Sequence, residues 1–375
     1  MKKFFRLYHS AALVASVILL LNAPGAFAQG IQEPIDRSAL MSKLASKSLL
    51  LCVTRAGKRI LAAGEHGIIV YSDNNGQSWT QAKVPVSVTL TNIRFITPQK
   101  GWAVGHSGVI LYSEDSGRTW NQQLDGSQAV MLMLEAAKAK AMAEPGEQTR
   151  RALANAELFV QDGPDKPFLD IYFVDELRGF IVGAYNMVFH TQDGGKSWQP
   201  WLDHVQNPDG LHLYGIQPAD NYLFMAGERG LFLRSADQGQ TFSLLPTPYE
   251  GSYFGLLCLS RDTILIYGLK GNAFKSSDFG NTWQQIDPGV SITITAALEL
   301  ADGSCVLTTQ SGEVLISHDH AKTFSKIDLK GEIYPLMGIA QAINGDLVLV
   351  GTRGAKVIAV SRESASANIR YAGER

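Results

Sequence analysis

The chain has 375 residues, of which 45% are hydrophobic and 18% are charged, and its formal net charge is −2. This composition is typical of a folded globular protein and excludes a disordered chain or a coiled coil. A slightly acidic chain also lacks the excess of Lys and Arg that nucleic-acid binding requires, so no nucleic-acid partner is expected.

The first 28 residues have the pattern of a secretory signal peptide. Three basic residues precede an apolar run over residues 11–21, and the small residues Ala26 and Ala28 follow at cleavage spacing. The run is short for a transmembrane helix, and an uncleaved anchor is the alternative. We expect an exported, periplasmic or extracytoplasmic protein that is soluble after signal cleavage. Its formal charge is then −5, because the signal holds three basic residues and no acidic one.

A turn motif recurs down the rest of the chain at nearly fixed intervals. It has the form Ser-x-Asp-x-Gly-x-Thr-Trp, and its final aromatic residue occurs six times, at Trp79, Trp120, Trp198, Phe242, Trp283 and Phe324. A second motif, Gly-x-x-Gly, lies about a dozen residues upstream of each aromatic residue, with some variation, and occurs a seventh time at 351–354. The sequence therefore predicts seven repeats.

Each repeat has the pattern of four short strands joined by turns, and its period is near 40 residues, which is typical of a β-propeller blade. We therefore expect an all-β fold over residues 29–375, a seven-bladed β-propeller of four-stranded antiparallel blades. The segment after Val360 lacks the turn motif. The stretch after Gln29 is the expected source of the strand that closes the ring, and the C-terminal tail is the alternative.

The recurring turn is predicted to stabilise the fold. Its carboxylate and hydroxyl groups can bond to the turn's own backbone, its glycine allows a positive φ, and its aromatic residue packs within the propeller. Two repeats depart from the pattern, because Asn74 replaces the aspartate of the first and Ala321 the glycine of the sixth. Structural roles are assigned to Asn74, Asp115, Asp193, Asp237, Asp278 and Asp319.

One interval between turns is too long. Trp120 and Trp198 are 78 residues apart, which leaves about 37 residues beyond one blade. The surplus is rich in Ala, Leu, Met, Glu and Lys, opens with Ser127 as a candidate cap and is divided by Pro145 and Gly146. It predicts a helical hairpin insert and linker over residues 121–167, between blades two and three. Strand order places the insert at the same end of the propeller as the Gly-x-x-Gly turns.

That end also gathers aromatic residues and arginine, which protein interfaces enrich. For each residue the alternative is a solvated turn position or an aromatic seal over the central channel. His66 and His106 lack a third ligand, so no metal site and no cofactor are expected. The predicted partner-binding residues are Arg229, Lys270, Arg353, His66, His106, Tyr185, Tyr214, Tyr253 and Tyr334.

The three cysteines, Cys52, Cys258 and Cys305, have no metal-ligand or redox spacing. We expect them to be buried and unpaired, and a disulfide between Cys258 and Cys305 is the alternative. No cysteine stands at the expected cleavage point, so the sequence gives no support for a lipoprotein anchor. We also expect a monomer.

The recurring turn resembles the Asp-box, or bacterial neuraminidase repeat, which also occurs in sialidases. The alternative function is therefore a carbohydrate-binding or sialidase-like glycoside hydrolase propeller. A sialidase requires three arginines around the substrate carboxylate, a tyrosine nucleophile with its glutamate, and an aspartic acid. Only Arg94, Arg229 and Arg353 are candidates for the three arginines, and the tyrosine, glutamate and aspartic acid are not recognisable in the sequence. We expect no enzyme and no small-molecule substrate.

Nearly the whole mature chain resembles the photosystem II assembly and stability factor family, including its relatives in non-photosynthetic bacteria. The resemblance rests on the Asp-boxes, on the placement of the insert and on the sequence GPDKPFLD at 163–170. It implies a non-catalytic exported propeller that serves as a protein-binding scaffold or assembly factor for a membrane complex. Photosynthetic members carry a patch of arginines, which here is reduced to Arg229, Lys270 and Arg353, so an envelope complex is the expected partner.

Overall fold

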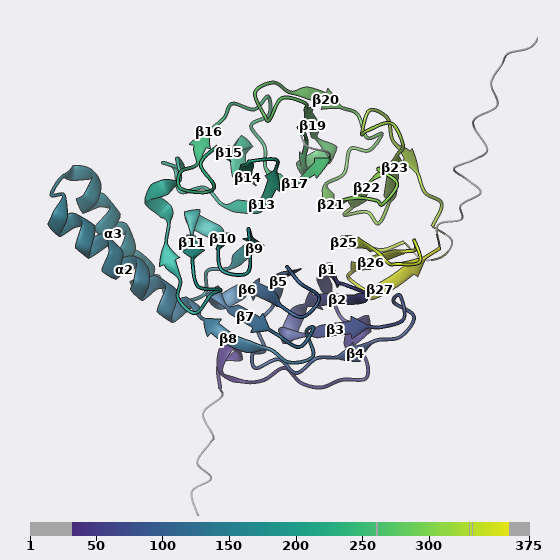
Figure 1. Cartoon of the computed structure of the whole chain (residues 1–375), viewed down its shortest axis with the longest axis horizontal. Coiled ribbons are helices and arrows are strands. Elements are labelled where there is room, and N and C mark those ends of the chain that lie inside the picture. Colours follow the sequence, from purple (N-terminus) through teal and green to yellow (C-terminus); the bar gives the residue numbers. More distant parts are fainter. Residues whose placement is uncertain (1–31, 260–261, 330, 332, 360–375) are drawn as a thin grey trace, which may run out of the picture. The chain divides into compact units, whose positions relative to one another are not determined.

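The computed structural model describes residues 32–259, 262–329, 331 and 333–359, and the expected signal peptide at 1–28 lies outside them. The chain divides into residues 1–33 and a compact unit from Pro34 to Arg375, which contains every described sheet. Seven antiparallel sheets follow one another around a ring (Figure 1). The seven-bladed β-propeller is confirmed, with four strands in six blades and three described strands in the last.

The strands are short and follow chain order within every blade. Blade 1 contains β1 (Leu50–Ala56), β2 (Arg59–Gly64), β3 (Ile69–Ser72) and β4 (Thr80–Gln81), and blade 2 contains β5 (Leu90–Phe95), β6 (Gly101–Gly105), β7 (Ile110–Ser113) and β8 (Asn121–Leu124). Blade 3 contains β9 (Phe168–Phe173), β10 (Gly179–Gly183), β11 (Val188–Thr191) and β12 (Gln199–Pro200), and blade 4 contains β13 (Leu213–Ala219), β14 (Tyr222–Gly227), β15 (Phe232–Ser235) and β16 (Ser243–Leu244). Blade 5 contains β17 (Tyr253–Leu259), β18 (Thr263–Gly268), β19 (Ala273–Ser276) and β20 (Gln284–Ile286). Blade 6 contains β21 (Ile294–Glu299), β22 (Cys305–Thr309), β23 (Val314–Ser317) and β24 (Ser325–Lys326), and blade 7 contains β25 (Leu336–Gln341), β26 (Leu347–Gly351) and β27 (Gly354–Ile358).

The hydrophobic core lies between the blades. The first strand of each blade faces the centre of the ring, and the second strand is buried along nearly its whole length because it packs between two neighbouring sheets (Figure 1). The aromatic residue of each Asp-box joins the cluster that its blade shares with the preceding one. Trp120, for example, packs with Leu61 and Ile69 of blade 1. The boxes therefore hold adjacent blades together as well as turning the chain.

The ring closes by packing of β1 against β25 and β26. None of residues 32–49 pairs with β27, so the predicted closing strand is not formed by the described part of the N-terminal stretch. That stretch instead satisfies backbone groups of the connection between β4 and β5: Ser87 donates its N–H to Pro34 (2.7 Å), and Ala39 donates its N–H to Val84 (3.1 Å). The alternative closing segment, after residue 359, lies outside the described residues.

The insert between blades 2 and 3 is a helical hairpin of α2 (Gly126–Ala143) and α3 (Glu147–Asp162), which extends from the ring (Figure 1). The cap of α2 is Asp125 and not Ser127. The Asp125 carboxylate accepts a hydrogen bond from the Gln128 N–H, and the Gln128 side chain accepts one from the Asp125 N–H. This reciprocal capping box satisfies two groups at the helix start, which a serine two residues later could not do.

At one end of the propeller, the Asp-box turns repeat one set of hydrogen bonds. In the second box the Ser113 hydroxyl donates to Asp115 (2.9 Å) and accepts the Gly117 N–H (2.9 Å), while Asp115 accepts the N–H (3.0 Å) and the hydroxyl (2.7 Å) of Thr119. The boxes of Asp193, Asp237, Asp278 and Asp319 make the same bonds.

Asn74 preserves the pattern of the first box by reversing one bond. Its amide oxygen accepts the Ser78 N–H (2.9 Å) and the Ser72 hydroxyl (2.9 Å), as an aspartate would, but its amide nitrogen donates to the Ser78 hydroxyl (2.9 Å). Because a hydroxyl group can either donate or accept, serine at position 78 accommodates the exchange. The departure from the motif therefore costs no hydrogen bond.

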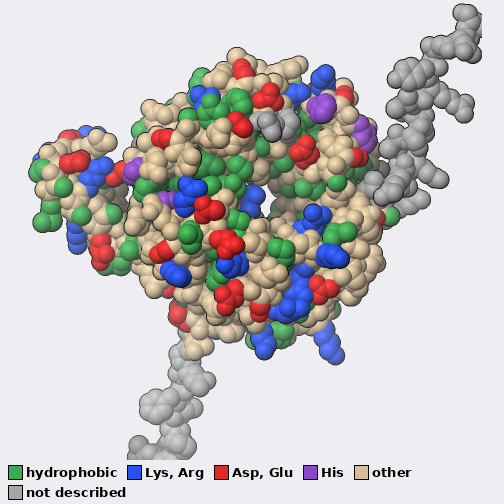
Figure 2. Space-filling view, viewed as in Figure 1, with side chains coloured by type: hydrophobic (Ala, Val, Ile, Leu, Met, Phe, Trp, Pro, Cys, Tyr) green, Lys and Arg blue, Asp and Glu red, His purple; other side chains and the backbone are tan. Residues whose placement is uncertain are grey.

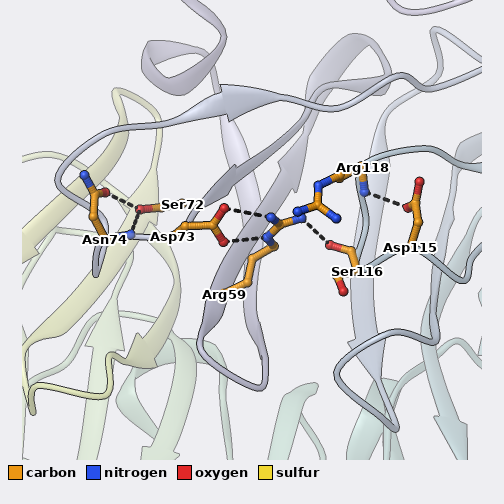
Figure 3. Close-up of polar contacts among 7 residues, drawn as sticks. All are labelled: Arg59, Ser72, Asp73, Asn74, Asp115, Ser116 and Arg118. Atoms are coloured by element: carbon orange, nitrogen blue, oxygen red, sulfur yellow. Dashed lines mark hydrogen bonds and ion pairs between the residues drawn. The ribbon is translucent and has the colours of Figure 1, made fainter.

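A cation also links the first two boxes (Figure 3). The buried Arg59 side chain forms two hydrogen bonds to the Asp73 carboxylate (both 2.7 Å), donates to the Ser116 carbonyl of the next blade (3.0 Å) and stacks on Tyr71. Two later blades repeat this contact, with Arg234 donating to the Phe279 carbonyl (2.9 Å) and Lys275 to the His320 carbonyl (2.8 Å). The carbonyl in each case belongs to a box residue with positive φ.

Candidate functional site

The opposite end of the propeller carries the Gly-x-x-Gly turns and the connections between blades. The Gly67 N–H, for example, donates to the Val88 carbonyl of the following connection (2.7 Å). The start of α2 lies at this same end, because a Cβ on Gly108 would lie 2.6 Å from the Gly126 Cα. We call this the tip end. It combines seven variable turns with the one element that the ring does not need for closure.

Four tips hold a bulky residue in the left-handed backbone region. His66, Tyr185, Arg229 and Lys270 occupy the same turn position in blades 1, 3, 4 and 5, with φ of 53°, 54°, 51° and 58°, and all four are exposed. Non-glycine residues with such φ values are uncommon, and large side chains there are strained. Retained strain that points a large side chain into solvent is a feature of functional surfaces. These four residues are therefore candidates for contact with a partner.

Five rings form a continuous series from the insert to the first strand of blade 5. Phe159 of α3 lies edge-on to Tyr185, with ring centres 6.3 Å apart, and Tyr185 lies edge-on to His212 at 4.6 Å. The series continues from His212 to Tyr214 at 6.2 Å and from Tyr214 to Phe254 at 5.3 Å. We call these five residues the aromatic track. It crosses blades 3, 4 and 5 at the tip end.

Hydrogen bonds fix the middle of the track. The Tyr185 N–H donates to His212 Nδ1 (2.9 Å), which places the proton of a neutral imidazole on Nε2. The His212 N–H donates to the Glu228 carboxylate (3.2 Å), next to Arg229. Tyr185 is 52% exposed and the other four rings are half-buried. The track thus presents apolar surface with polar groups at its side, as protein interfaces do.

The sequence GPDKPFLD connects the insert to blade 3, and every second residue of its later part is buried. Lys166, Phe168 and Asp170 are buried, at spacing two, as expected for a strand that faces the core. The Lys166 ammonium lies 5.3 Å from the Phe159 ring and pairs with Asp162 (3.6 Å). This motif therefore fixes the base of α3 and with it the first ring of the track.

Asp170 is a buried junction between three central strands. Its carboxylate accepts hydrogen bonds from the Asn92 side chain (2.6 Å) and the Ile216 N–H (2.9 Å), and it lies 3.5 Å from Arg94, whose side chain is one-third exposed. Burial raises the pKa of Asp170, against the opposing effect of Arg94 and of the Ile216 and Ile171 N–H groups. The centre of the ring, where these strands meet, is visibly hollowed in Figure 2.

The structure divides the predicted partner-binding residues into groups. Tyr185 and Tyr214 belong to the track, and Arg229 and Lys270 lie on blades 4 and 5, which it crosses. His66 and His106 lie on blades 1 and 2, and Tyr334 and Arg353 lie on blade 7. Tyr253 was predicted to bind a partner, but its side chain is fully buried, and its hydroxyl donates to the Tyr249 carbonyl (3.4 Å). It faces inward because β17 alternates, so the neighbouring Phe254 reaches the track instead.

Phe159, His212 and Phe254 belong to the track but are not among the partner-binding residues predicted from the sequence. Phe159 lies in α3 and Phe254 lies in β17. The five rings come from separate parts of the chain, between positions 159 and 254. The regular repeat period was the one available signal, because it places equivalent positions of successive blades side by side.

The remaining predictions concern metals, cysteines and catalysis. The described residues contain no group of three or more His, Cys, Asp or Glu side chains that could hold a metal ion. All three cysteines are free, with Cys52 and Cys305 buried and Cys258 half-buried. The three arginines considered for a sialidase are not brought together. Arg94 pairs with Asp170 on the central strands, while Arg229 and Arg353 lie at the tips of blades 4 and 7.

Comparison with known proteins identifies a family. The model of the family described as photosynthesis system II assembly factor YCF48 matches residues 71–138 and 156–367, which is more than half of the chain. A relative from Synechococcus sp. (strain CC9902), "Photosystem II assembly lipoprotein Ycf48", is 25% identical over 50% of this chain and 57% of its own length. The chain spans about half the length of the two curated relatives it matches.

Solved structures share the fold at low identity. A structure described as YCF48 bound to D1 peptide has a TM-score of 0.61 at 15% identity and covers 85% of this chain and 97% of that one. A Niastella koreensis GH74 enzyme has a TM-score of 0.59 at 12% identity, over 84% of this chain and 52% of that one. Because an enzyme and a peptide-binding protein share the fold, the fold alone does not assign a function.

Proposed function

The chain belongs to the family of the photosynthesis system II assembly factor YCF48, and on that premise we propose that it is a non-catalytic, exported assembly factor that binds a protein partner. The partner is a subunit of a membrane or envelope complex, and the tip end is the surface that holds it. The aromatic track is the observation that carries this assignment, because it is a prearranged, partly apolar surface that the ring does not need for its own closure.

The chemistry of the track favours a short polypeptide segment. Exposed aromatic rings contribute large contact area at low cost in side-chain entropy, and the amide and carboxylate groups beside them can orient a backbone. Arg229 and Lys270 flank the track on blades 4 and 5 and favour an acidic segment. In the structure described as YCF48 bound to D1 peptide, a peptide is the ligand, which supports the same class of partner here.

Export is part of the proposal and rests on the sequence of residues 1–28, which lie outside the described residues. Among the described helices, none has the length and apolar character needed to span a membrane. The relative from Synechococcus is named a lipoprotein, which is consistent with a family that acts outside the cytoplasm.

The proposal is tested by affinity capture from solubilised envelope of the source cells. The wild type is compared with Tyr185→Gly and with a chain in which residues 127–160 are replaced by a short Gly-Ser bridge. The bridge is feasible because Gly126 and Pro164 are adjacent: a Cβ on Gly126 would lie 2.1 Å from the Pro164 carbonyl oxygen. We expect Tyr185→Gly to weaken capture about ten-fold or more and the deletion to abolish it.

Phe279→Gly is the matched control, because Phe279 is also an aromatic residue in the left-handed region (φ 59°) but belongs to an Asp-box at the other end. It should leave capture unchanged. Full capture by the folded deletion variant, or equal losses in Tyr185→Gly and Phe279→Gly, would remove the tip end as the binding surface. Turnover of a sialidase substrate by the wild type would support the glycoside hydrolase alternative.

A further inference from the structure

A short loop before β1 reverses the usual pattern of burial. Ala39 and Ala45 are buried, at 8% and 3% exposure, whereas the larger side chains between them are exposed: Leu40 by 84%, Met41 by 63% and Leu44 by 62%. These three residues are among the five most exposed large hydrophobic side chains of the described residues. Single exposed apolar residues are normal, but three in five positions form a patch that needs an explanation.

Hydrogen bonds hold the loop in this orientation. The Ser42 N–H donates to the Gln81 side chain (2.8 Å), the Gln81 amide donates to the Leu40 carbonyl (2.9 Å), and the Ala39 N–H donates to the Val84 carbonyl (3.1 Å). Figure 1 shows this first described segment, in purple, along the outside of blade 1. The apolar side chains are therefore presented by a backbone that is fixed to the sheet at β4 and at the connection that follows it.

Cations accompany the apolar side chains. Arg37, Lys43 and Lys47 are exposed and form no ion pair with any described residue. Asp36 is the one acidic residue between positions 34 and 47. The segment thus carries a positive excess of two, although the whole chain is slightly acidic.

We propose that Leu40, Met41 and Leu44, with Arg37, Lys43 and Lys47, form a site that binds the surface of an anionic phospholipid bilayer. Aliphatic side chains interleaved with cations are the pattern of interfacial membrane contacts, in which the apolar groups enter the headgroup boundary and the cations meet phosphate. A protein partner would favour aromatic and arginine-rich contacts, which lie on the aromatic track instead. This inference does not rest on the proposed function.

The loop leads directly into the tip end. A Cβ on Gly354, in the last Gly-x-x-Gly turn, would lie 2.0 Å from the Ser46 carbonyl oxygen, and the Leu49 N–H donates to the Glu65 side chain of the first turn (2.9 Å). The lipid site and the turns therefore belong to one connected region. Binding through the loop brings the tips of blades 7 and 1 close to the bilayer.

The test measures partition onto vesicles. Residues 29–375, which include the whole compact unit, are mixed at low salt with vesicles of phosphatidylglycerol and phosphatidylethanolamine, or of phosphatidylcholine alone. We expect binding to the anionic vesicles only. The triple change Leu40→Ser, Met41→Ser and Leu44→Ser should lower the partition coefficient at least ten-fold, and each cation changed to Gln should lower it about five-fold.

The matched control is the pair Leu177→Ser and Ile343→Ser, because these side chains are exposed by 58% and 53% but lie elsewhere. A fluorophore attached through Met41→Cys gives a second reading. Burial raises the pKa of the three natural thiols to about 12, so they compete poorly for the label. A blue shift on anionic vesicles is expected at position 41 and not for a label attached through Ile343→Cys.

Absence of binding to anionic vesicles, or equal losses in the control pair, would overturn the lipid site. If the wild type captures a protein from envelope extract and the triple variant does not, the loop would be assigned to a protein partner instead. Tyr185→Gly separates this site from the track, because it should leave vesicle binding unchanged while weakening capture of the partner.

Discussion

At the box end of the propeller, six turns repeat the same hydrogen bonds, whereas at the tip end the equivalent turns carry histidine, serine, tyrosine, arginine and lysine at one position. Both ends use positive φ, but they use it differently. The box glycine lies where the preceding blade is close, as Gly239 lies beside Phe180, whereas four tip turns hold a large, exposed residue in this region. Uniform turns hold blades together, and varied turns on the same repeat leave a surface free to specialise.

Lowering the pH should have the largest effect, because the box turns depend on ionised aspartates. For Asp115 and Asp193 burial alone would raise the pKa, but hydrogen bonds from the neighbouring hydroxyl and amide groups outweigh it and lower it. A hydrogen bond from Thr282 is the largest effect that lowers the pKa of Asp278, and one from the Thr323 N–H does so for Asp319.

A lowered folded-state pKa gives stability that is complete above the unfolded pKa and is lost as the pH falls below it. We expect the melting temperature to fall between about pH 5 and pH 2, by more than any single substitution below produces at neutral pH. Asp115→Asn should make this dependence shallower, because the amide does not titrate. A melting temperature that is constant over this range would contradict the role given to the boxes.

Gly239→Ala should be the most damaging single change. Gly239 has φ of 90°, and a Cβ there would lie 2.1 Å from Cζ of the buried Phe180. Left-handed strain and overpacking together should lower the free energy of unfolding by about 2–4 kcal/mol, measured by denaturant titration. The control is Gly345→Ala (φ 94°), where nothing lies within 4 Å of the added Cβ and only the strain remains. Equal losses in both would exclude a contribution from blade contact.

Asp115→Ala should lower the free energy of unfolding by about 1–3 kcal/mol, because the Arg118 and Thr119 amides and two hydroxyl groups lose their acceptor. Asp115→Asn should cost less, as the Asn74 box demonstrates. Partner capture by the folded protein should not change in either variant. A variant with normal stability and lost capture would move the binding surface to the box end.

Arg229→Gly should have opposite effects on stability and on binding. Glycine removes the left-handed strain at a position of φ 51°, so the free energy of unfolding should rise by about 0.5–1 kcal/mol. Capture of the partner should weaken, because a cation beside the track is lost. Measuring both on one preparation tests whether the tip strain is retained for function, and a loss of stability would show that Arg229 is a structural residue.

Ala321→Gly should produce the smallest effect. Ala321 takes the glycine position of the sixth box with φ of 57° and is fully buried. Glycine relieves the strain but loses a buried methyl group and gains entropy in the unfolded chain, so a gain of at most about 1 kcal/mol is expected by thermal melting. A clear loss would show that the methyl group fills space that glycine fills in the other boxes.

The sequence predicted the features that recur in every blade, and it missed features that occur at only one position in the fold. The blade count, the box turns and the insert follow from periodicity and from Pro145 and Gly146. Burial of Tyr253 depended on the phase of β17, and a shift of one residue exchanges it with Phe254. The path of residues 34–39 is set by hydrogen bonds to backbone groups of the connection between β4 and β5, and no local sequence pattern predicts these bonds. The track needed the spatial order of blades.

The closure between β1 and β25 has a consequence for how the molecule opens. Every other neighbouring pair of blades is joined by the chain itself, but blades 7 and 1 are held by side-chain packing and by contacts such as the hydrogen bond from Arg55 to the Gln341 carbonyl (3.3 Å). Separating them breaks none of the described sheets. We therefore expect the amide hydrogens of the central strands to exchange first at this seam. The loop at 39–45 leads into the segment that packs on β27, so a ligand bound to the loop is expected to change how often the ring opens.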